Sequence, residues 1–400
     1  MFSLIVTCLM FTAATFTSPE TLIRLGLFSL FEPQQVNVRL GTGDAFSLRA
    51  GTVNEARISA GELVRIRKTG KQIQVTVLDA YGRLKQTTAA QEVRLSPLNA
   101  STLELNLPKQ ITRVVRGELL VSVRGQNSQN ALQLVLLTDR EEAVASVVAA
   151  EMSGITSSES LKALAVVVRT FMTSHADRHA REGFDFCDTT HCQLYRGEDD
   201  LYAQTASQQV ENAVMATSGE VLYFNHRAIE GHYTAVCGGL TAMPEMVWGG
   251  ATRSGYPYTE IACKWCAGSH YTKWERRASA TAVLSALAAA KGIKLSQATQ
   301  IQIEKYQESE IVQSVVIKDR GRKVVLNADE FRRVIGRRIG WNRVLSPTFT
   351  LEHYADSFIF RGRGFGSQVG LCVAGTAAQA AAGRSYKEIL DFYYPQTEMK

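Results

Sequence analysis

The stretch DREEAVASVVAAEM, residues 139–152, decides the fold because the texture of the sequence changes there. It predicts a helix that ends at SGIT, and a second helix is predicted in TSSESLKALAVVVRTFMTSHADRH, residues 156–179. Thr156 and Glu159 form the pattern of a capping box at its start. The spacing i, i+3, i+4, i+7 predicts one buried face, formed by Leu161, Leu164, Ala165 and Val168.

Before this change the chain is rich in predicted strands. Residues 22–136 contain Val-, Ile- and Thr-rich runs with period-2 alternation, such as LVRIRKTGKQIQVTVLD at 63–79, separated by Gly and Asn. After it, helices and strands mix. We therefore expect an α+β fold, with a β-rich N-terminal region over 18–138 followed by a mixed helical and β catalytic-type core over 139–400. Within that core, residues 276–350 are expected to form a smaller α/β insertion.

The composition is that of an ordinary globular protein. The 400 residues are 45% apolar and 20% charged, enough for two or three domains with cores. The net charge of +6 is spread over several short basic patches. Because a nucleic-acid footprint is more concentrated, we expect no nucleic-acid partner.

The first residues form an apolar run without charge, MFSLIVTCLMFTAATF. This is typical of the hydrophobic part of a signal peptide, and it is shorter than the roughly 20 residues of a usual membrane span. Residues 1–17 are therefore predicted to be a signal peptide or an uncleaved membrane anchor. Either one predicts export to the periplasm or cell envelope.

Cysteine usage leaves two chemistries open. In an exported protein an even set favours disulfides, whereas in a cytosolic one the C-x4-C and C-x2-C spacings favour a metal. Spacing alone does not decide between them. Apart from Cys8, the set consists of Cys187, Cys192, Cys237, Cys263, Cys266 and Cys372.

The glycine-rich stretch FRGRGFGSQVGL, residues 360–371, resembles a nucleotide-binding turn only superficially. Gly364, Gly366 and Gly370 give G-x-G-x3-G, no second strand with an acidic residue follows, and the Lys of a P-loop is absent. We expect a loop whose backbone approaches another group closely or adopts positive φ. It is either a tight connection between a strand and a helix or a wall of a polymer-binding cleft.

Several motifs in order resemble the sporulation stage II protein D and amidase-enhancer family over roughly residues 140–400. They are VVAAEM, ESLKALAVVVRTF, FDFCDTTHCQLYRG, AVMATSGEVLYFNHRAIEGHYTAVCGGLT, VWGG, YPY, FRGRGFGSQVGL and YKEILDFYYP. The resemblance implies a bacterial peptidoglycan lytic transglycosylase that cleaves the MurNAc–GlcNAc bond of glycan strands, preferring strands without stem peptides. The alternative is a scaffold that binds peptidoglycan without cutting it, or an activator of a cell-wall amidase.

The resemblance places the catalytic acid of the family on Glu151. One carboxylate can suffice where the sugar's own hydroxyl is the nucleophile, since no water has to be activated. We expect the pKa of this acid to be raised by the apolar neighbours Val147, Val148 and Met152. Without the resemblance, an exposed glutamate at a helix end would be the simpler interpretation.

The resemblance also implies a zinc site in some members, on Cys187, Cys192 and one of His175, His179 or His191. Thiolate and imidazole suit tetrahedral zinc. We expect no cofactor other than zinc. A zinc-dependent or cysteine-nucleophile hydrolase is a weaker interpretation, since the sequence contains no recognised signature of either class.

Disulfides are expected slightly ahead of zinc. A Cys187–Cys192 bond would close a small loop. Cys263 and Cys266 carry the same ambiguity, and the resemblance implies that Cys237 and Cys372, in two cleft loops, bridge them.

Five positions depart from the family pattern. Ser153 replaces a proline, and Thr234 aligns with a histidine, two residues after His232. Ser367 replaces a histidine, Gln368 a glycine and Val373 the usual glutamine. Lost imidazoles would remove a substrate hydrogen bond or a group that tunes the acid. The expected substrate-binding residues are Arg169, Tyr195, His232, Thr234, Ser367 and Gln368.

Overall fold

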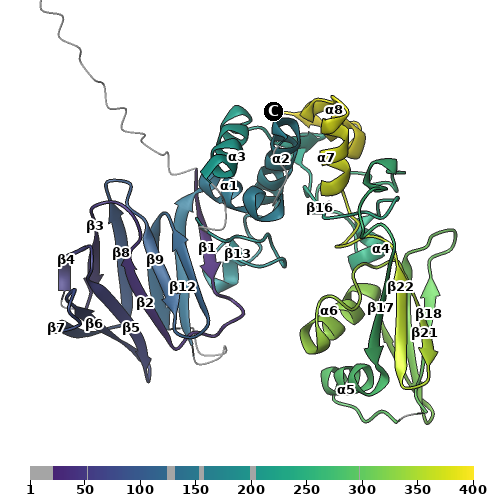
Figure 1. Cartoon of the computed structure of the whole chain (residues 1–400), viewed down its shortest axis with the longest axis horizontal. Coiled ribbons are helices and arrows are strands. Elements are labelled where there is room, and N and C mark those ends of the chain that lie inside the picture. The colour runs from purple at the N-terminus through teal and green to yellow at the C-terminus, as the bar shows by residue number, and fades with distance from the viewer. Residues whose placement is uncertain (1–20, 52, 124–130, 153–156, 199–203, 297) are drawn as a thin grey trace, which may run out of the picture. The chain divides into compact units, whose positions relative to one another are not determined.

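The computed structural model describes residues 21–51, 53–123, 131–152, 157–198, 204–296 and 298–400 (Figure 1). The predicted leader, residues 1–17, and Ser153 lie outside them. The chain divides into two compact units, Met1–Glu142 and Ala143–Lys400. Strands dominate the first and helices mix with short sheets in the second, which confirms the predicted α+β class.

Unit 1 is built from two antiparallel sheets that lie against each other, with contacts between β3 and β7 and between β6 and β11. The strands of this unit in the first sheet are, in order, β1 (Leu22–Leu27), β12 (Leu132–Asp139), β11 (Glu118–Val123), β8 (Glu92–Leu98), β3 (Ala45–Ala50) and β4 (Val53–Ser59). The second sheet consists of β10 (Ile111–Val115), β9 (Leu103–Leu107), β2 (Gln35–Leu40), β5 (Leu63–Thr69), β6 (Gln72–Leu78) and β7 (Leu84–Ala90).

Period-2 alternation explains how these sheets bury a core. In β6 the side chains of Ile73, Val75 and Val77 are buried, while Gln72 and Gln74 between them are exposed. Successive side chains of a strand point to opposite faces, so each strand offers one apolar face to the facing sheet.

Helix α2 (Ser158–Ser174) is the centre of unit 2. It contacts α3 (Gln204–Ala216), α7 (Val373–Ala381) and α8 (Tyr386–Tyr393). Helix α1 (Arg140–Glu151) precedes it.

Two expectations for α2 need correction. Its N-cap is Ser157, without a side-chain capping bond, and Thr156 lies outside the described residues. The four predicted core residues are buried, but so are Ala163, Val166 and Val167 between them, because neighbours cover more than one face of the helix.

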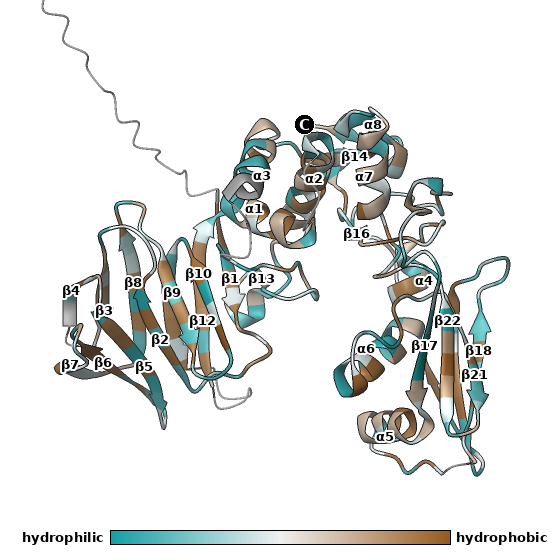
Figure 2. Ribbon diagram, in the orientation of Figure 1, coloured by the Kyte–Doolittle hydropathy of each residue, from teal (hydrophilic) through white to brown (hydrophobic). Residues whose placement is uncertain are grey.

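A smaller α/β body follows, with its own apolar core. The helices are α4 (Pro244–Trp248), α5 (Ala280–Lys291) and α6 (Ala328–Ile339). One sheet contains β17 (Trp274–Ser279), β22 (Ser357–Gly362) and β21 (Phe349–Tyr354), and the other β18 (Gln300–Lys305), β19 (Val312–Asp319) and β20 (Arg322–Leu326). Figure 2 shows apolar residues along β22 and on α6, where Phe331, Phe349 and Phe360 pack together. The sheet therefore includes a strand beyond residue 350.

Short elements connect these parts. They are η2 (Ala180–Glu182), β13 (Phe186–Cys187), β14 (Leu222–Phe224), β15 (Arg227–Ala228), β16 (Tyr233–Thr234), η3 (Lys264–Cys266), β23 (Leu371–Cys372) and β24 (Glu398–Met399). The predicted hairpin turn at Asn225–His226 is confirmed, with both residues at positive φ. No helix in the described part of the chain is long and apolar enough to cross a membrane.

Candidate active site and cysteine clusters

The glycine-rich segment packs its backbone directly on residues 232–242. Val236 and Phe365 exchange two backbone hydrogen bonds of 3.0 and 2.7 Å, and β16 pairs in parallel with β23. A Cβ on Gly370, which has φ +72°, would lie 2.0 Å from the carbonyl oxygen of His232. The expected close approach and positive φ are confirmed. The partner, however, is another loop of this chain, so these glycines are needed for internal packing.

Glu151 is the last residue of α1, and its side chain is half-buried. The hydroxyl of Tyr233, on β16, donates a hydrogen bond of 3.3 Å to Oε1 of Glu151. Burial raises the pKa of this carboxyl group, against the opposing effects of the Tyr233 hydrogen bond and the positive charge of Arg196. The direction agrees with the prediction, and the expected neighbours Val147, Val148 and Met152 are buried.

Two residues near this acid were missed in the sequence. Tyr233 follows His232 in GHYT, and Arg196 follows Tyr195 in QLYRG, so each stood beside a residue that was considered. Burial, followed by the nearby Glu151, raises the pKa of the Tyr233 hydroxyl well above its ordinary value, so it stays a donor. The Arg196 side chain is exposed, while its backbone N–H donates to Ser146 Oγ of α1 at 3.1 Å.

Arg169 is not a cleft residue, which corrects the prediction. Its side chain is fully buried. The guanidinium donates to the carbonyl oxygens of Glu220, at 3.0 Å, and Val214, at 3.4 Å, near the end of α3. It therefore holds α3 and the following turn against α2.

Gln368 and Thr234 are likewise satisfied inside the protein. The amide of Gln368 donates to the carbonyl of Cys237 at 2.6 Å and accepts from Thr348 Oγ1 at 2.8 Å. Thr234 Oγ1 donates to the Phe365 carbonyl at 3.1 Å and accepts from the Gln368 backbone at 3.1 Å. Both side chains are 3% exposed, so neither is placed to bind substrate.

Three expected binding residues remain. The Tyr195 side chain is buried, whereas His232 and Ser367 are half-buried. The His232 ring lies 4.8 Å from the Trp248 ring and 5.9 Å from that of Tyr258. Burial in these aromatic surroundings lowers the pKa of His232 to about 3, so the imidazole is neutral at neutral pH.

The first cysteine cluster contains His179, Cys187, His191 and Cys192, whose ligand atoms all lie within 4.8 Å of one another. His179 Nε2 is 3.3 Å from Cys192 Sγ, while its Nδ1 is 2.6 Å from a carboxylate oxygen of Glu182. This carboxylate leaves Nε2 facing the cluster, as in many zinc sites. Hydrogen bonds from Cys192, His191 and Thr189 lower the pKa of Cys187 to about 3. Two imidazoles and two thiols fit tetrahedral zinc.

His175, the third candidate histidine, does not join this cluster. Its Nδ1 lies 3.2 Å from the Phe171 carbonyl oxygen, and its ring stacks on that of Phe171 at 4.2 Å.

The second cluster contains Cys237, Cys263, Cys266 and Cys372. All four are buried, and their sulfur atoms also lie within 4.8 Å of one another. The six cysteines that the structure describes are free thiols. The structure places the cysteines of the expected Cys187–Cys192, Cys263–Cys266 and Cys237–Cys372 pairs in two clusters without disulfide bonds, and these disulfides stay predictions.

Comparison with known proteins agrees with this arrangement of motifs. Residues 128–224 match the model of a family described as Stage II sporulation protein. The chain is 27% identical over 278 residues to the Stage II sporulation protein D of Bacillus subtilis, covering 65% of this chain and 74% of the relative. Residues 128–224 thus resemble the stage II sporulation protein family, and the chain is similar over about two thirds of its length to stage II sporulation protein D.

Two further relatives show how far the similarity to this family extends. An uncharacterized protein of Brachyspira hyodysenteriae is 30% identical over 255 residues, which is 64% of each chain. The Amidase enhancer of Bacillus subtilis is 25% identical over 298 residues, 63% of this chain and 39% of the relative. This chain therefore spans less than two thirds of the Brachyspira relative's length.

The family match and the site overlap only in part. Glu151, Arg196 and the first cysteine cluster fall within residues 128–224, whereas Tyr233, the second cluster and the glycine-rich segment follow later in the chain. Tyr233, the hydrogen-bond partner of Glu151, thus comes from outside the matched segment.

Proposed function

We propose that this chain is a peptidoglycan lytic transglycosylase in which Glu151 is the single general acid and base. The observation that carries the proposal is the half-buried carboxyl group with a raised pKa, hydrogen-bonded to Tyr233. The names of the relatives, stage II sporulation protein D and amidase enhancer, support a role in cell-wall processes of sporulation.

The reaction needs only one carboxyl group that can exist in both forms. Protonated Glu151 donates its proton to the glycosidic oxygen as the bond from that oxygen to C1 of the muramic acid breaks. The C6 hydroxyl of the same sugar then bonds to C1, and its proton returns to Glu151, which leaves a 1,6-anhydro ring. One acid suffices because the attacking hydroxyl belongs to the sugar itself, so no second carboxylate has to activate a water molecule.

Neighbouring residues favour each form of the acid in turn. Desolvation keeps a proton on Glu151 before the reaction, and the Tyr233 hydroxyl and the Arg196 charge stabilise the carboxylate after the proton has left. The half-buried His232 ring, neutral and flanked by Trp248, offers an uncharged polar group next to Tyr233. Of the six substrate-binding residues expected from the sequence, we propose that His232 and Ser367 contact the substrate.

We propose that the first cysteine cluster binds zinc. His179, Cys187, His191 and Cys192 would supply all four ligands, so bound zinc acts as a structural ion that fixes this turn. The turn leads directly to Arg196, whose backbone is anchored on α1. A zinc ion held by these four residues would support the position of Arg196, the charged residue next to the acid.

We further propose that the protein acts outside the cytoplasm, in the periplasm or cell envelope. The apolar run at residues 1–17 and the substrate class support this location. Fractionation of cells that express the full chain tests it, because a cytosolic product would contradict both signal and anchor.

The decisive experiment is digestion of denuded glycan strands with purified protein, followed by mass spectrometry. We expect products with 1,6-anhydromuramic ends, and we expect Glu151→Gln to lower their rate of formation by about 100-fold or more. Glu211→Gln removes an exposed carboxylate from α3 and is the matched control, with activity unchanged. Products formed equally fast by Glu151→Gln would refute the role of this acid.

A second candidate function is a scaffold that binds glycan or activates a cell-wall amidase. It is favoured by the similarity to an amidase enhancer and by Ser367, which stands where the family has a histidine. In that case wild type and Glu151→Gln bind strands equally well, release no anhydro products and stimulate an added amidase to the same extent.

A further inference from the structure

We propose that Cys237, Cys263, Cys266 and Cys372 form a second, structural zinc site. This four-cysteine cluster lies apart from the histidine-containing one and shares no residue with it. The inference does not depend on the proposed enzymatic activity.

The spacing of the sulfur atoms fits one tetrahedral ion. With Zn–S bonds of about 2.3 Å, tetrahedral geometry places the sulfurs about 3.8 Å apart. In the structure all four Sγ atoms lie within 4.8 Å of one another, and those of Cys237 and Cys266 are 3.6 Å apart. Small movements of buried side chains therefore bring all four to bonding distance.

The surroundings supply the hydrogen bonds that thiolate ligands require. The backbone N–H groups of Cys237 and Gly375 both donate to Cys372 Sγ at 3.3 Å. The Tyr393 hydroxyl lies 3.2 Å from Cys263 Sγ. Donors aimed at sulfur orient metal ligands and stabilise their negative charge. A Cβ on Gly375 would lie 2.2 Å from the Tyr393 hydroxyl and 2.9 Å from Cys263 Sγ, so only glycine leaves this cradle open.

The four ligands come from three distant parts of unit 2. Cys263 directly precedes the short turn η3, and Cys266 is the last residue of that turn. Cys237 follows β16, and Cys372 is the N-cap of α7. One ion would thus fasten residues 232–242, the η3 turn and the end of the glycine-rich segment together. All four ligands are protein thiols and are buried, which is the pattern of a closed structural site.

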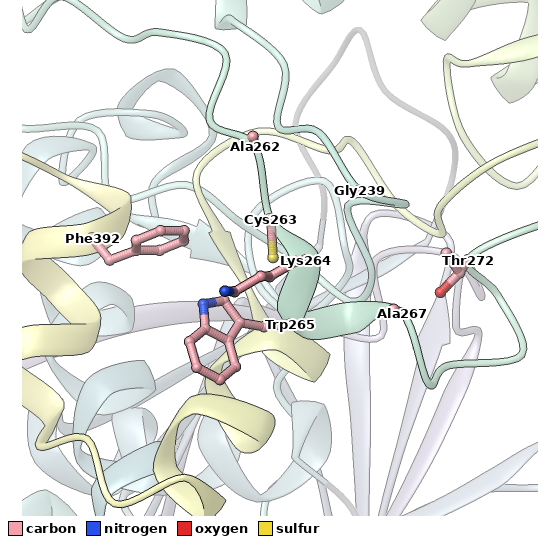
Figure 3. Close-up of a pocket in the computed structure, with 8 residues that line it drawn as sticks. All are labelled: Gly239, Ala262, Cys263, Lys264, Trp265, Ala267, Thr272 and Phe392. Atoms are coloured by element: carbon pink, nitrogen blue, oxygen red, sulfur yellow. The ribbon is translucent and has the colours of Figure 1, made fainter.

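A cavity of about 350 Å³ lies beside the cluster. Figure 3 shows Cys263 among its lining residues, together with Trp265 and with Phe392 of α8.

Disulfides are the competing arrangement. They would place sulfurs in two pairs about 2.05 Å apart, with no need for a common centre or for N–H donors aimed at Cys372. An oxidising compartment favours them chemically. The convergence of four sulfurs and the hydrogen bonds at Cys372 favour a metal.

Metal content of the purified full chain tests the proposal. The background variant Cys187→Ser with Cys192→Ser disables the first cluster, and we expect it to retain one zinc per chain. Adding Cys263→Ser and Cys266→Ser should remove that zinc. Both pairs exchange two cysteines for serines, so the background variant controls for the loss of two thiols as such. A background variant without zinc overturns the proposal.

X-ray absorption at the zinc edge decides the matter even if the fourfold variant fails to fold. In the background variant we expect four sulfur neighbours at about 2.3 Å and no nitrogen. Mass spectrometry after chelation and alkylation should find all four cysteines modified without reductant. Cysteines that resist alkylation until reduced, or zinc with nitrogen or oxygen neighbours, would overturn the site. Glu151→Gln should keep its full zinc content, which separates this test from that of the activity.

Discussion

Two ends of one short segment, residues 233–237, behave in opposite ways. At Tyr233 the chain offers a hydroxyl to Glu151, a half-buried carboxyl group with its pKa raised by burial. Four residues later, at Cys237, the carbonyl oxygen accepts a hydrogen bond from the Gln368 amide, and the sulfur lies among three other thiols. The first end is part of the proposed proton transfer, and the second end fastens the chain internally.

The difference shows that membership of a motif does not by itself make a polar residue available to a substrate. Thr234 belongs to the same motif as Tyr233, and Gln368 belongs to the glycine-rich motif, yet their polar atoms are used internally. A charged or polar group left partly open to solvent is available for chemistry. One with all its hydrogen bonds made inside the protein contributes to stability.

The largest effect, a loss of stability, is expected at the end near Cys237, where the hydrogen bonds are made inside the protein. Gln368→Ala removes the partner of Thr348 Oγ1 and of the Cys237 carbonyl, both buried, and should lower the free energy of unfolding by about 3 kcal/mol. Chemical denaturation measures this loss. Gln300→Ala, at an exposed position of β18, is the control and should change stability by less than about 0.5 kcal/mol.

Activity separates the two roles of Gln368. Per folded molecule, the variant should cut glycan at the wild-type rate. A loss of cutting without a loss of stability would return Gln368 to the substrate-binding residues.

A smaller effect, on the pH dependence and rate of the reaction, is expected at the end near Tyr233. Tyr233→Phe removes a hydrogen bond that lowers the pKa of Glu151, so that pKa should rise further. Because the acid then stays protonated to higher pH, the alkaline limb of the rate profile should move upward. The maximal rate should fall about tenfold, the equivalent of about 1.4 kcal/mol.

Tyr223→Phe is the matched control for that change, since it removes a hydroxyl from a half-buried tyrosine on β14. Its pH profile should coincide with that of the wild type. An unshifted alkaline limb in Tyr233→Phe would mean that the hydroxyl does not tune the acid.

The smallest effect concerns stability against pH. The folded-state pKa of Glu151 lies above the ordinary glutamate value of 4.5, so ionising this group costs more in the folded state. Wild type and Glu151→Gln should therefore differ least below pH 4.5, and the variant should become relatively more stable as pH rises through that value toward neutrality. Thermal melts of both proteins across this range measure the difference. A gap that widens toward acid pH would contradict the direction of the shift.

Much of the architecture was legible in the sequence. The change from period-2 strands to helices at Asp139 predicted the α+β class, since alternation in strands and the apolar pattern of residues 158–174 are local properties. The order of motifs predicted the family and placed Glu151 at a helix end. It also predicted the direction of its pKa shift, because Val147, Val148 and Met152 are close in sequence.

Only the tertiary structure decided which polar groups face each other across long separations. Arg169 was predicted to line a cleft, but its guanidinium is buried against backbone carbonyl groups. Tyr233 donates a hydrogen bond to Glu151, which lies 82 positions earlier in the chain. Cysteine spacing left disulfides and metal open, and the folded chain gathered the six described thiols into two clusters. The physical reason is the same throughout: periodicity fixes an element and its faces, whereas burial and hydrogen-bond partners depend on segments that only the fold brings together.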